Sequence, residues 1–533
     1  MKKLNVTWDI RKEGKTLYHH WSKCVGAGRA NEGLRTAWQK QLKTIHDECG
    51  FEYIRFHGLL CDDMFVYSEE NGQPVYNWSY VDELFDFITG IGMKPFVEFG
   101  FMPEALASGT GTQFWWKGNI TPAKDNDKWA ALLKAAVEHW IERYGFDEVV
   151  TWYFEIWNEP NLWAFWNGTR SQYFAMYHAS VLAIKSIDER LRVGGPATSN
   201  FVPDERFDGE KEDFTKHKTF MVDDINTLEW HGVWIESFLN YCADNNLPVD
   251  FVSCHPYPTD FALDGQDVPE GQPTEFQGRS RYRDCLKDDL TWLKNMIKNS
   301  AYPDVEIHLT EWSSSPTSRD YSHDHLPAAN YVVKSNIDNT GMTDSLSYWV
   351  FTDIFEEVGG GPQALHGGFG LMNMQGLRKP TYHAYRMLHN LGTQEIERGD
   401  EYIMTKTEDG KLRGLIYNYA DELTDSVPIS EYPDYTKAQN FQAMGSYKEI
   451  NMTIAGLSAG DRVQVEVLDV KHGCIAEAWK NMGYPRNLTK EQTAKLHEVS
   501  QATDITEYVA DEEGKVIINT IIGTWAIAAI NQL

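Results

Sequence analysis

The chain has 533 residues, of which 78 are Asp or Glu and 49 are Lys or Arg, so its formal net charge is −29 at pH 7. A field of this sign repels phosphate backbones and anionic lipid headgroups, which argues against nucleic acid, membrane surfaces and polyanionic polysaccharides as partners. The length is too great for one ordinary hydrophobic core and predicts a large domain of barrel size together with a smaller one.

The distribution of cysteines and of apolar residues indicates the cellular compartment in which the protein resides. The seven cysteines are an odd number, are widely scattered and form no C-x-x-C pair, which indicates free thiols in a reducing compartment. The first residues are basic but no apolar run follows them, and no segment approaches the roughly 18 consecutive apolar residues of a membrane span. We therefore expect a cytoplasmic protein with no secretory signal.

Short apolar runs alternate along the chain with longer segments of helical periodicity, which predicts repeated βα units around parallel strands. Eight units fit this pattern and favour a (β/α)₈ TIM barrel, an α/β fold. The predicted strands lie near residues 23–28, 52–57, 94–99, 151–157, 192–195, 250–255, 305–311 and 345–351. The predicted helices lie near residues 31–48, 79–91, 126–144, 171–189, 229–245, 281–299, 325–339 and 379–391.

The pattern changes after Gly392 to period-two alternation, as in Arg462–Val467, which predicts an accessory antiparallel β-sandwich domain. A helix-like stretch near 475–500 interrupts the alternation, and the first dozen residues alternate and offer the sandwich one more strand. The predicted domains are a barrel over residues 14–392 and a sandwich over residues 1–13 plus 393–533.

Three predicted loops are longer than most connections between elements, at residues 200–228, 257–280 and 352–378. Each follows a predicted strand, so all three should meet at the C-terminal face of the barrel. There they would form the rim of a pocket or a contact between subunits.

The segment Trp152–Asn161 ends a buried strand with an amide and a carboxyl group, Asn158 and Glu159, beside a proline. Burying such groups is costly unless they have a function, and barrel active sites form at this face. Glu159 is therefore the first catalytic candidate. The alternative is an ordinary acidic residue at a helix N-terminus.

A second strand, Val305–Trp312, also ends near a glutamate, Glu311. These strands are the fourth and the seventh in the predicted order, so both carboxylates would point into one cavity. Glycoside cleavage uses such a pair, with one acid that protonates the leaving oxygen and one carboxylate that attacks carbon or activates water. A surface salt bridge is the alternative for Glu311, but Trp312 and the serines 313–315 indicate a loop that leaves the barrel rim.

Six motifs follow one another along the chain: Arg55–Asp63, Glu155–Asn161, His255–Tyr257, Leu309–Trp312, Phe355–Glu357 and His366–Leu371. With these motifs in this order, the chain resembles the retaining glycoside hydrolases of clan A, and within that clan family 39 with its bacterial β-xylosidases. The resemblance covers about residues 20–390.

The resemblance implies that Glu159 is the acid/base and Glu311 the nucleophile. It also implies a set of substrate-binding residues, namely His57, Asn158, His255, Tyr257, Trp349 and Glu357. Asn158 would bind the sugar 2-hydroxyl and Tyr257 would hydrogen-bond Glu311, while Trp349, expected on strand eight, would pack against the ring.

Each binding residue has an alternative interpretation. His57 and His255 could be core histidines, Trp349 could fill the barrel, and Glu356 rather than Glu357 could face the pocket. The aromatic run 114–116 either walls the leaving-group side or belongs to the core.

The charge states of the two carboxyls follow from their expected spacing. In a retaining site they lie about 5 to 5.5 Å apart, so repulsion and partial burial should raise the pKa of Glu159, while hydrogen bonds keep Glu311 ionised. His323-Asp324-His325 lacks the spacing of a metal-binding pair. We expect neither a metal nor a cofactor.

The leading hypothesis is an exo-acting β-xylosidase that hydrolyses small neutral β-1,4-xylo-oligosaccharides or aryl β-xylosides. The alternatives are an α-L-iduronidase, an arabinose-specific glycosidase, and a non-catalytic carbohydrate-binding protein. An α-L-iduronidase would need cationic groups for the uronate carboxylate. The family resemblance also implies a homo-oligomer, often a tetramer.

Overall fold

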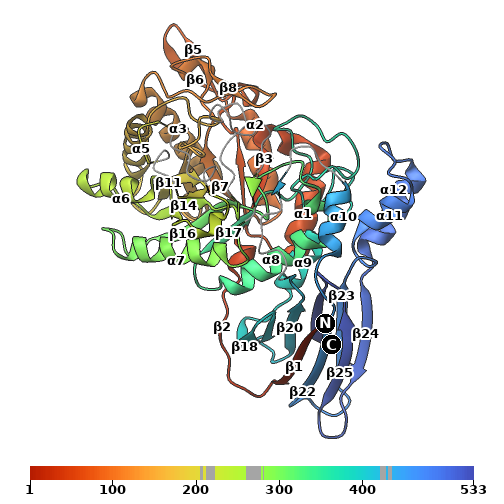
Figure 1. Cartoon of the computed structure of the whole chain (residues 1–533). Helices are drawn as coiled ribbons and strands as arrows, with labels where there is room; N and C mark the ends of the chain where they lie inside the picture. The colour runs from red at the N-terminus through yellow and green to blue at the C-terminus, as the bar shows by residue number, and fades with distance from the viewer. Residues whose placement is uncertain (204–207, 212–221, 260–277, 280, 421–427, 430–434) are drawn as a thin grey trace.

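A computed structural model describes residues 1–203, 208–211, 222–259, 278–279, 281–420, 428–429 and 435–533. Figure 1 shows a barrel of strands surrounded by helices, with a second group of strands below it that contains both chain termini.

Eight strands form a closed barrel in which every strand is parallel to both neighbours, and they follow the chain order around the barrel. This arrangement confirms the predicted (β/α)₈ fold. Most strand residues are buried, as expected where helices cover the outside and side chains fill the inside. The strands are β3 (Cys24–Arg29), β4 (Tyr53–His57), β7 (Lys94–Phe99), β10 (Tyr153–Ile156), β11 (Arg192–Ser199), β14 (Phe251–His255), β16 (Glu306–Trp312) and β17 (Ser345–Tyr348).

A helix follows each barrel strand and packs outside the barrel (Figure 1). These helices are α1 (Thr36–Cys49), α2 (Ser79–Gly90), α3 (Asn126–Tyr144), α5 (Arg170–Lys185), α6 (Ile235–Asp244), α7 (Cys285–Lys298), α8 (Leu326–Asp338) and α9 (Pro380–His389), with a short α4 (Phe146–Val149) after α3.

Two helices start at least five residues later than the sequence predicts. The helix expected from residue 31 starts at Thr36, because Ala30–Leu34 forms a 3₁₀ helix. The helix expected from residue 229 starts at Ile235, because β13 (His231–Gly232) pairs with β12 (Phe201–Val202) in an antiparallel ribbon.

The connections at the C-terminal face contain short strands that the sequence analysis did not predict. After β4, a hairpin joins β5 (Tyr67–Glu70) to β6 (Gln73–Tyr76), and after β7 a smaller one joins β8 (Thr112–Gln113) to β9 (Gly118–Asn119). Of the predicted long loops, the parts at 204–207, 212–221, 260–277 and 280 lie outside the described residues, whereas 352–378 is described throughout.

Two sheets form the accessory domain, and their facing side chains, among them Trp8, Met404 and Ile450, make a separate core. One sheet contains β1 (Lys2–Asp9), β22 (Lys448–Ala455) and β25 (Val516–Ile522). The other has the order β2 (Lys15–Thr16), β18 (Gln394–Gly399), β19 (Tyr402–Lys406), β20 (Leu412–Tyr417), β26 (Ile527–Gln532), β23 (Arg462–Leu468) and β24 (Asp504–Val509).

The pairing within this domain departs from a purely antiparallel sandwich. β1 and β22 run parallel. They can do so because they lie far apart in the sequence and no hairpin, which would make them antiparallel, connects them. β2, inside the range predicted for the barrel, pairs with β18 in the larger sheet. The domain boundaries at residues 13 and 392 therefore stay a prediction.

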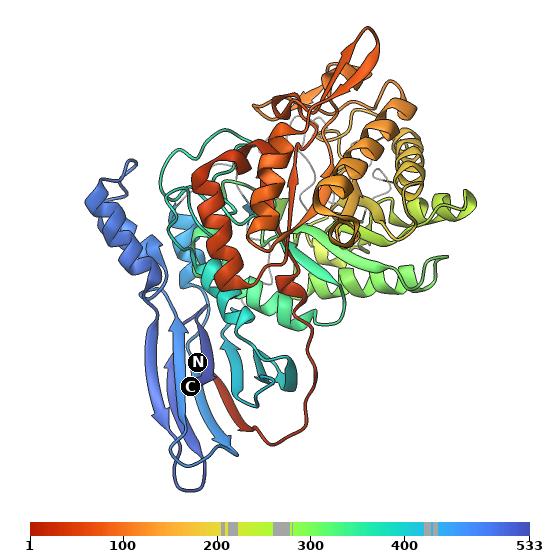
Figure 2. The same ribbon diagram turned by 180° about the vertical axis from the view of Figure 1, so that it is seen from behind.

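Three helices accompany the accessory strands: α10 (Tyr435–Ala443), α11 (Ile475–Asn481) and α12 (Lys490–Gln501). Seen from behind, α11 and α12 stand at the end of the sandwich that is nearer the barrel helices (Figure 2). A further small ribbon pairs β15 (Gly278–Arg279) with β21 (Pro428–Ile429). Within the described ranges, every helix is too short or too polar to cross a bilayer.

A fully buried lysine fastens the connection after β17, which helps to enclose the C-terminal face. Lys379 Nζ lies 2.7 Å from Asp324 Oδ1 and 2.8 Å from Asp353 Oδ2, and it donates to the Gly368 carbonyl at 2.7 Å. The backbone N–H of Gly370 in turn donates to Asp353 at 2.7 Å. This cluster fixes the backbone on both sides of Phe369, which lines the barrel cavity.

We predict that Lys379→Met lowers the free energy of unfolding by about 3–5 kcal/mol, since it leaves two buried carboxylates without their cation. Thermal and urea unfolding of the purified variant measure this. The matched control is Lys471→Met at an exposed lysine, which should change stability by less than about 0.5 kcal/mol. Equal stability of the two variants would contradict the prediction.

Candidate active site

Glu159 and Glu311 meet at the C-terminal end of the barrel. One carboxylate oxygen of each, together with one ring nitrogen of His255, lie within 4.8 Å of one another. Glu159 follows β10 by three residues and Glu311 is the penultimate residue of β16, so the fourth and seventh strands place them. Both are 5% exposed and line a cavity of about 240 Å³. The other lining residues include Phe114, Trp163, Phe165, Asn200, Tyr257, Trp349, Glu357 and Phe369.

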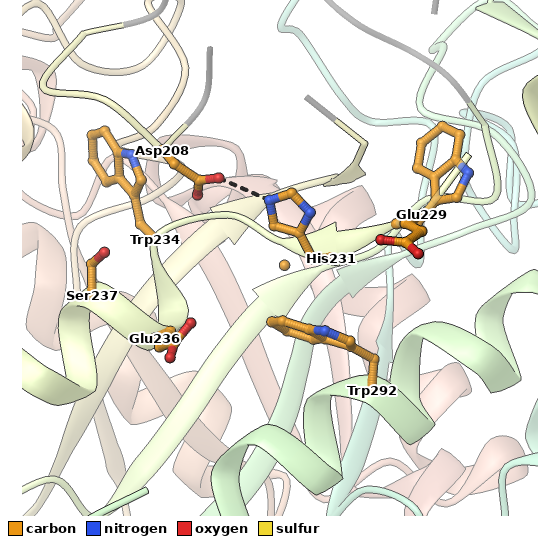
Figure 3. A pocket seen from close by; sticks show the side chains of 9 residues that line it. Asp208, Glu229, His231, Trp234, Glu236, Ser237 and Trp292 are labelled. Carbon is orange, nitrogen blue, oxygen red and sulfur yellow. Dashed lines mark hydrogen bonds and ion pairs between the residues drawn. The ribbon is translucent and has the colours of Figure 1, made fainter. Parts of the chain in front are cut away.

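A larger hollow of about 750 Å³ lies on the outside of the barrel between β13, α6 and α7 (Figure 3). In it, His231 Nε2 lies 2.8 Å from Asp208 Oδ2, and the His231 ring lies above Trp292. Among the residues that the structure describes, those lining this hollow include none of the predicted site residues. The smaller barrel cavity is therefore the candidate active site.

Arg55, in the middle of β4, is fully buried beneath the cavity and binds several groups at once. Its Nε donates to Glu155 Oε2 at 2.6 Å and its Nη1 donates to Glu311 Oε1 at 2.7 Å. Its Nη2 donates to Asn158 Oδ1 at 2.7 Å and lies 3.1 Å from Glu98 Oε2.

The sequence analysis quoted Arg55 in a motif but gave it no role. An arginine in the middle of a predicted buried strand was the available signal, because a buried charge requires partners.

Glu311 is stabilised as a carboxylate by its donors. Tyr257 Oη donates to Glu311 Oε2 at 3.2 Å, the contact that the sequence analysis expected, and Arg55 donates to the other oxygen. Burial raises the pKa of Glu311, and the positive charge of Arg55 and the neighbouring His57 oppose that rise. Of the two central carboxyls, Glu311 therefore ionises first.

Glu159 has a different environment although its exposure is the same. Its Oε1 lies 2.8 Å from His255 Nδ1, and the backbone turns at this residue with φ of +43°, held by a hydrogen bond from Glu159 N to the Ala197 carbonyl at 2.9 Å. Burial raises the pKa of Glu159 well above its ordinary value, and negative charge on Glu311 raises it further. The geometry thus separates a protonated carboxyl from an ionised one.

Two predicted binding residues lie behind the lining and present unused polar atoms. His57 Nδ1 is 2.6 Å from Glu98 Oε2, while its Nε2 has no hydrogen-bond partner in the described part of the chain. That nitrogen is 3.5 Å from Glu311 Oε1 and 3.6 Å from Glu357 Oε1. Asn158 Nδ2 is likewise buried and unpartnered within the described ranges. Such groups are costly unless a ligand satisfies them.

The structure separates the two adjacent glutamates after β17. Glu357 lines the cavity, where burial and the charge on Glu311 raise its pKa well above the ordinary value. Glu356 points the other way and forms ion pairs with Arg35 Nη1 at 2.5 Å and Arg29 Nη2 at 3.3 Å. Of the two, only Glu357 can reach a ligand in the cavity.

The predicted aromatic residues are also distributed between cavity and surface. Trp349 lines the cavity but directly follows β17, which ends at Tyr348, so it is not on strand eight as the sequence analysis expected. Its ring lies 4.8 Å from that of His57. In the run 114–116, Phe114 lines the cavity and Trp115 is 55% exposed.

Glu159, His255 and Glu311 are of the types that bind metals, and their spacing would allow it. The surrounding charge argues against this use. The fixed positive charge of Arg55 already occupies Glu311 Oε1, and Tyr257 donates to the other oxygen. The arrangement instead suits proton transfer and attack on an electrophile between two carboxyls.

A sequence profile of glycosyl hydrolases family 39 matches residues 4–516. The chain belongs to this family. A β-xylosidase from Caldicellulosiruptor saccharolyticus is 36% identical over 510 residues, which cover 94% of this chain and 92% of that protein. A β-xylosidase from Geobacillus stearothermophilus is 33% identical over 530 residues, covering 98% and 94%. The crystal structure of the family 39 enzyme from Xanthomonas axonopodis pv. citri superposes with a TM-score of 0.85 at 28% identity, covering 100% of this chain and 97% of that one.

We predict that Glu357→Gln lowers kcat/KM for an aryl glycoside by about 10- to 100-fold, because a buried carboxyl next to His57 is lost from the cavity. Glu356→Gln is the matched control, because its ion pairs with the two arginines lie outside the cavity, so their loss affects stability rather than binding in the cavity. Its kcat/KM should fall less than about fivefold. A larger loss in the Glu356 variant than in the Glu357 variant would contradict the assignment.

Proposed function

We propose that the protein is a retaining exo-β-xylosidase that removes xylose from the non-reducing ends of short neutral β-1,4-xylo-oligosaccharides. The observation that carries the proposal is that one carboxylate oxygen of Glu159 lies within 4.8 Å of one carboxylate oxygen of Glu311. Carboxyl groups lie about 5–5.5 Å apart in retaining glycosidases and about 6.5–9.5 Å apart in inverting ones. The full-length similarity to β-xylosidases supports the choice of sugar.

In the first step, a Glu311 oxygen attacks the anomeric carbon while Glu159 transfers its proton to the departing glycosidic oxygen. The C–O bond to the leaving group breaks as the bond to Glu311 forms, which gives a covalent glycosyl-enzyme. In the second step, Glu159 accepts a proton from water, and the resulting hydroxide equivalent displaces Glu311 from carbon.

The charge on Glu311 determines when Glu159 holds its proton. Before the reaction, that charge helps burial to keep Glu159 protonated. Once Glu311 is esterified its charge is gone, so the pKa of Glu159 falls and the residue can act as a base. This alternation lets one glutamate serve both steps.

The cavity suits one terminal sugar. Its volume of about 240 Å³ is below the range of about 300–1,000 Å³ for drug-sized ligands, which supports exo-action. We propose that Asn158 Nδ2 binds the 2-hydroxyl, that His57 and Glu357 bind hydroxyls farther round the ring, and that Trp349 covers an apolar face of the sugar. The unpartnered nitrogens of Asn158 and His57 support these roles.

The charge of the cavity weighs against a uronate substrate. Three of its described lining residues, Glu159, Glu311 and Glu357, are acidic and none is Lys or Arg, so the lining offers no cation to pair with a sugar carboxylate. Arg55 lies beneath the cavity but is already paired. Aryl glycosides that differ only in the sugar would separate xylose from arabinose specificity.

We also propose a reducing, cytoplasmic location, supported by seven cysteines that are all free and buried. The homotetramer that the family resemblance implies stays a prediction.

Glu311→Ala should abolish hydrolysis of aryl β-xylosides, because no nucleophile remains next to the anomeric carbon. Proton NMR of the first product released by the unaltered enzyme should show the β-anomer of xylose. Unchanged turnover in the variant would remove Glu311 from the mechanism. An α-anomer appearing first would exclude net retention.

Glu159→Ala should lower kcat/KM by about 10²–10⁴ for substrates with poor leaving groups. For aryl xylosides whose phenols are strongly acidic, the rate of the first step should fall much less in this variant, because such phenols depart without a proton. A series of aryl leaving groups therefore tests the acid role. Equal losses across the series would contradict it.

A further inference from the structure

A continuous hydrogen-bond chain runs beneath the cavity and ends on Glu159. Arg55 Nε donates to Glu155 Oε2 at 2.6 Å, and Thr310 Oγ1 donates to Glu155 Oε1 at 2.8 Å. Thr310 Oγ1 lies 2.9 Å from His255 Nε2, and His255 Nδ1 lies 2.8 Å from Glu159 Oε1. The three residues between the ends of the chain, Glu155, Thr310 and His255, are fully buried.

The direction of each hydrogen bond follows from the number of protons available. Glu155 is ion-paired with Arg55, and an ionised carboxylate can only accept hydrogen bonds. The single hydroxyl proton of Thr310 is therefore given to Glu155, and the oxygen of Thr310 must accept from its other neighbour. That neighbour is His255 Nε2, so Nε2 carries the imidazole proton.

A neutral imidazole protonated on Nε2 has only a lone pair on Nδ1. His255 is neutral because burial lowers its pKa well below the ordinary value, and the charges of Arg55 and His57 lower it further. The Nδ1 lone pair faces Glu159 Oε1, which can satisfy it only as a protonated carboxyl that donates. If Glu159 were ionised, its Oε1 and His255 Nδ1 would face each other with lone pairs only, and the two atoms are 2.8 Å apart.

We propose that Thr310 and Glu155 are positioning residues that fix the tautomer of His255 and thereby keep Glu159 in its proton-donating form until the glycosidic bond breaks. This inference rests on the proposed acid/base role of Glu159. After Glu159 has given its proton to the leaving group, its contact with Nδ1 is repulsive. The proton that Glu159 takes from water in the second step restores the hydrogen bond.

Other charged and titratable groups face Glu159 and His255, and these groups remain in place when the Thr310 hydroxyl is removed. They are Arg55 and His57 on β4, Glu98 on β7, Tyr257 after β14, Glu311 on β16 and Glu357 after β17. A change in proton affinity that follows removal of the hydroxyl alone is therefore assigned to the chain through His255.

The test compares Thr310→Val, which keeps the shape but removes the hydroxyl, with Thr310→Ser, which keeps the hydroxyl. The readout is the pH dependence of kcat/KM for an alkyl β-xyloside, whose departure needs a proton. Its alkaline limb reports the ionisation of the acid in the free enzyme. We expect Thr310→Val to move this limb to lower pH by about one unit, and Thr310→Ser to restore its position.

An unmoved limb in Thr310→Val, or an equal shift in Thr310→Ser, would overturn the inference. Nitrogen-15 NMR of the unaltered enzyme with labelled histidine tests it without any variant that must fold. The ring shifts of His255, assigned with a His255→Gln variant, should show the Nε2–H tautomer, and an Nδ1–H tautomer would overturn the inference.

Failure of the proposed function is distinguishable from failure of this inference. If Glu159 were not the acid, Glu159→Gln would retain both activity on the alkyl xyloside and the alkaline limb. If Glu159 is the acid but the chain does not control it, the Glu159 variant loses activity while the limb of Thr310→Val stays in place.

Discussion

The site depends on one buried cation, the guanidinium of Arg55, placed among more carboxyl groups than it can neutralise. Arginine stays protonated in any protein environment, so its charge is fixed, and it contacts Glu98, Glu155 and Glu311. Glu159 and Glu357 do not share these contacts, and burial raises the pKa of both. Contact with this one positive charge thus separates Glu311, which ionises, from Glu159 and Glu357, which keep their protons.

Chemical identity and exposure do not separate Glu159 from Glu311, since both are glutamates with 5% of their surface exposed. Their neighbours do. Glu311 receives hydrogen bonds from Arg55 and Tyr257, whereas Glu159 faces a histidine nitrogen. Opposite roles for the two residues follow from the donors and acceptors that strands β4, β14 and β16 bring to the barrel end. The barrel therefore contributes more than a scaffold, because it sets the protonation of the reacting groups.

Much of this arrangement could be predicted from local pattern. Alternation of apolar runs with helical segments gave all eight barrel strands, and the positions of Glu159 and Glu311 at strand ends placed them in one cavity. The β5–β6 hairpin was missed although Asn71-Gly72, a strong turn signal, lies at its tip. The link from Thr310 to His255 was out of reach, because it depends on contacts between residues 55 positions apart. Which of Glu356 and Glu357 faces the cavity depended likewise on the distant partners Arg29 and Arg35.

The central claim is that Glu311 bonds to the sugar carbon while Glu159 supplies and recovers the proton. The most direct measurement is mass spectrometry of the enzyme after incubation with a 2-deoxy-2-fluoro-β-xyloside bearing a highly acidic phenol, which slows breakdown of a covalent intermediate. The account predicts a stoichiometric fluoroxylosyl adduct on the peptide that contains Glu311. An adduct on the peptide that contains Glu159, or none in an enzyme that turns over β-xylosides, would contradict it.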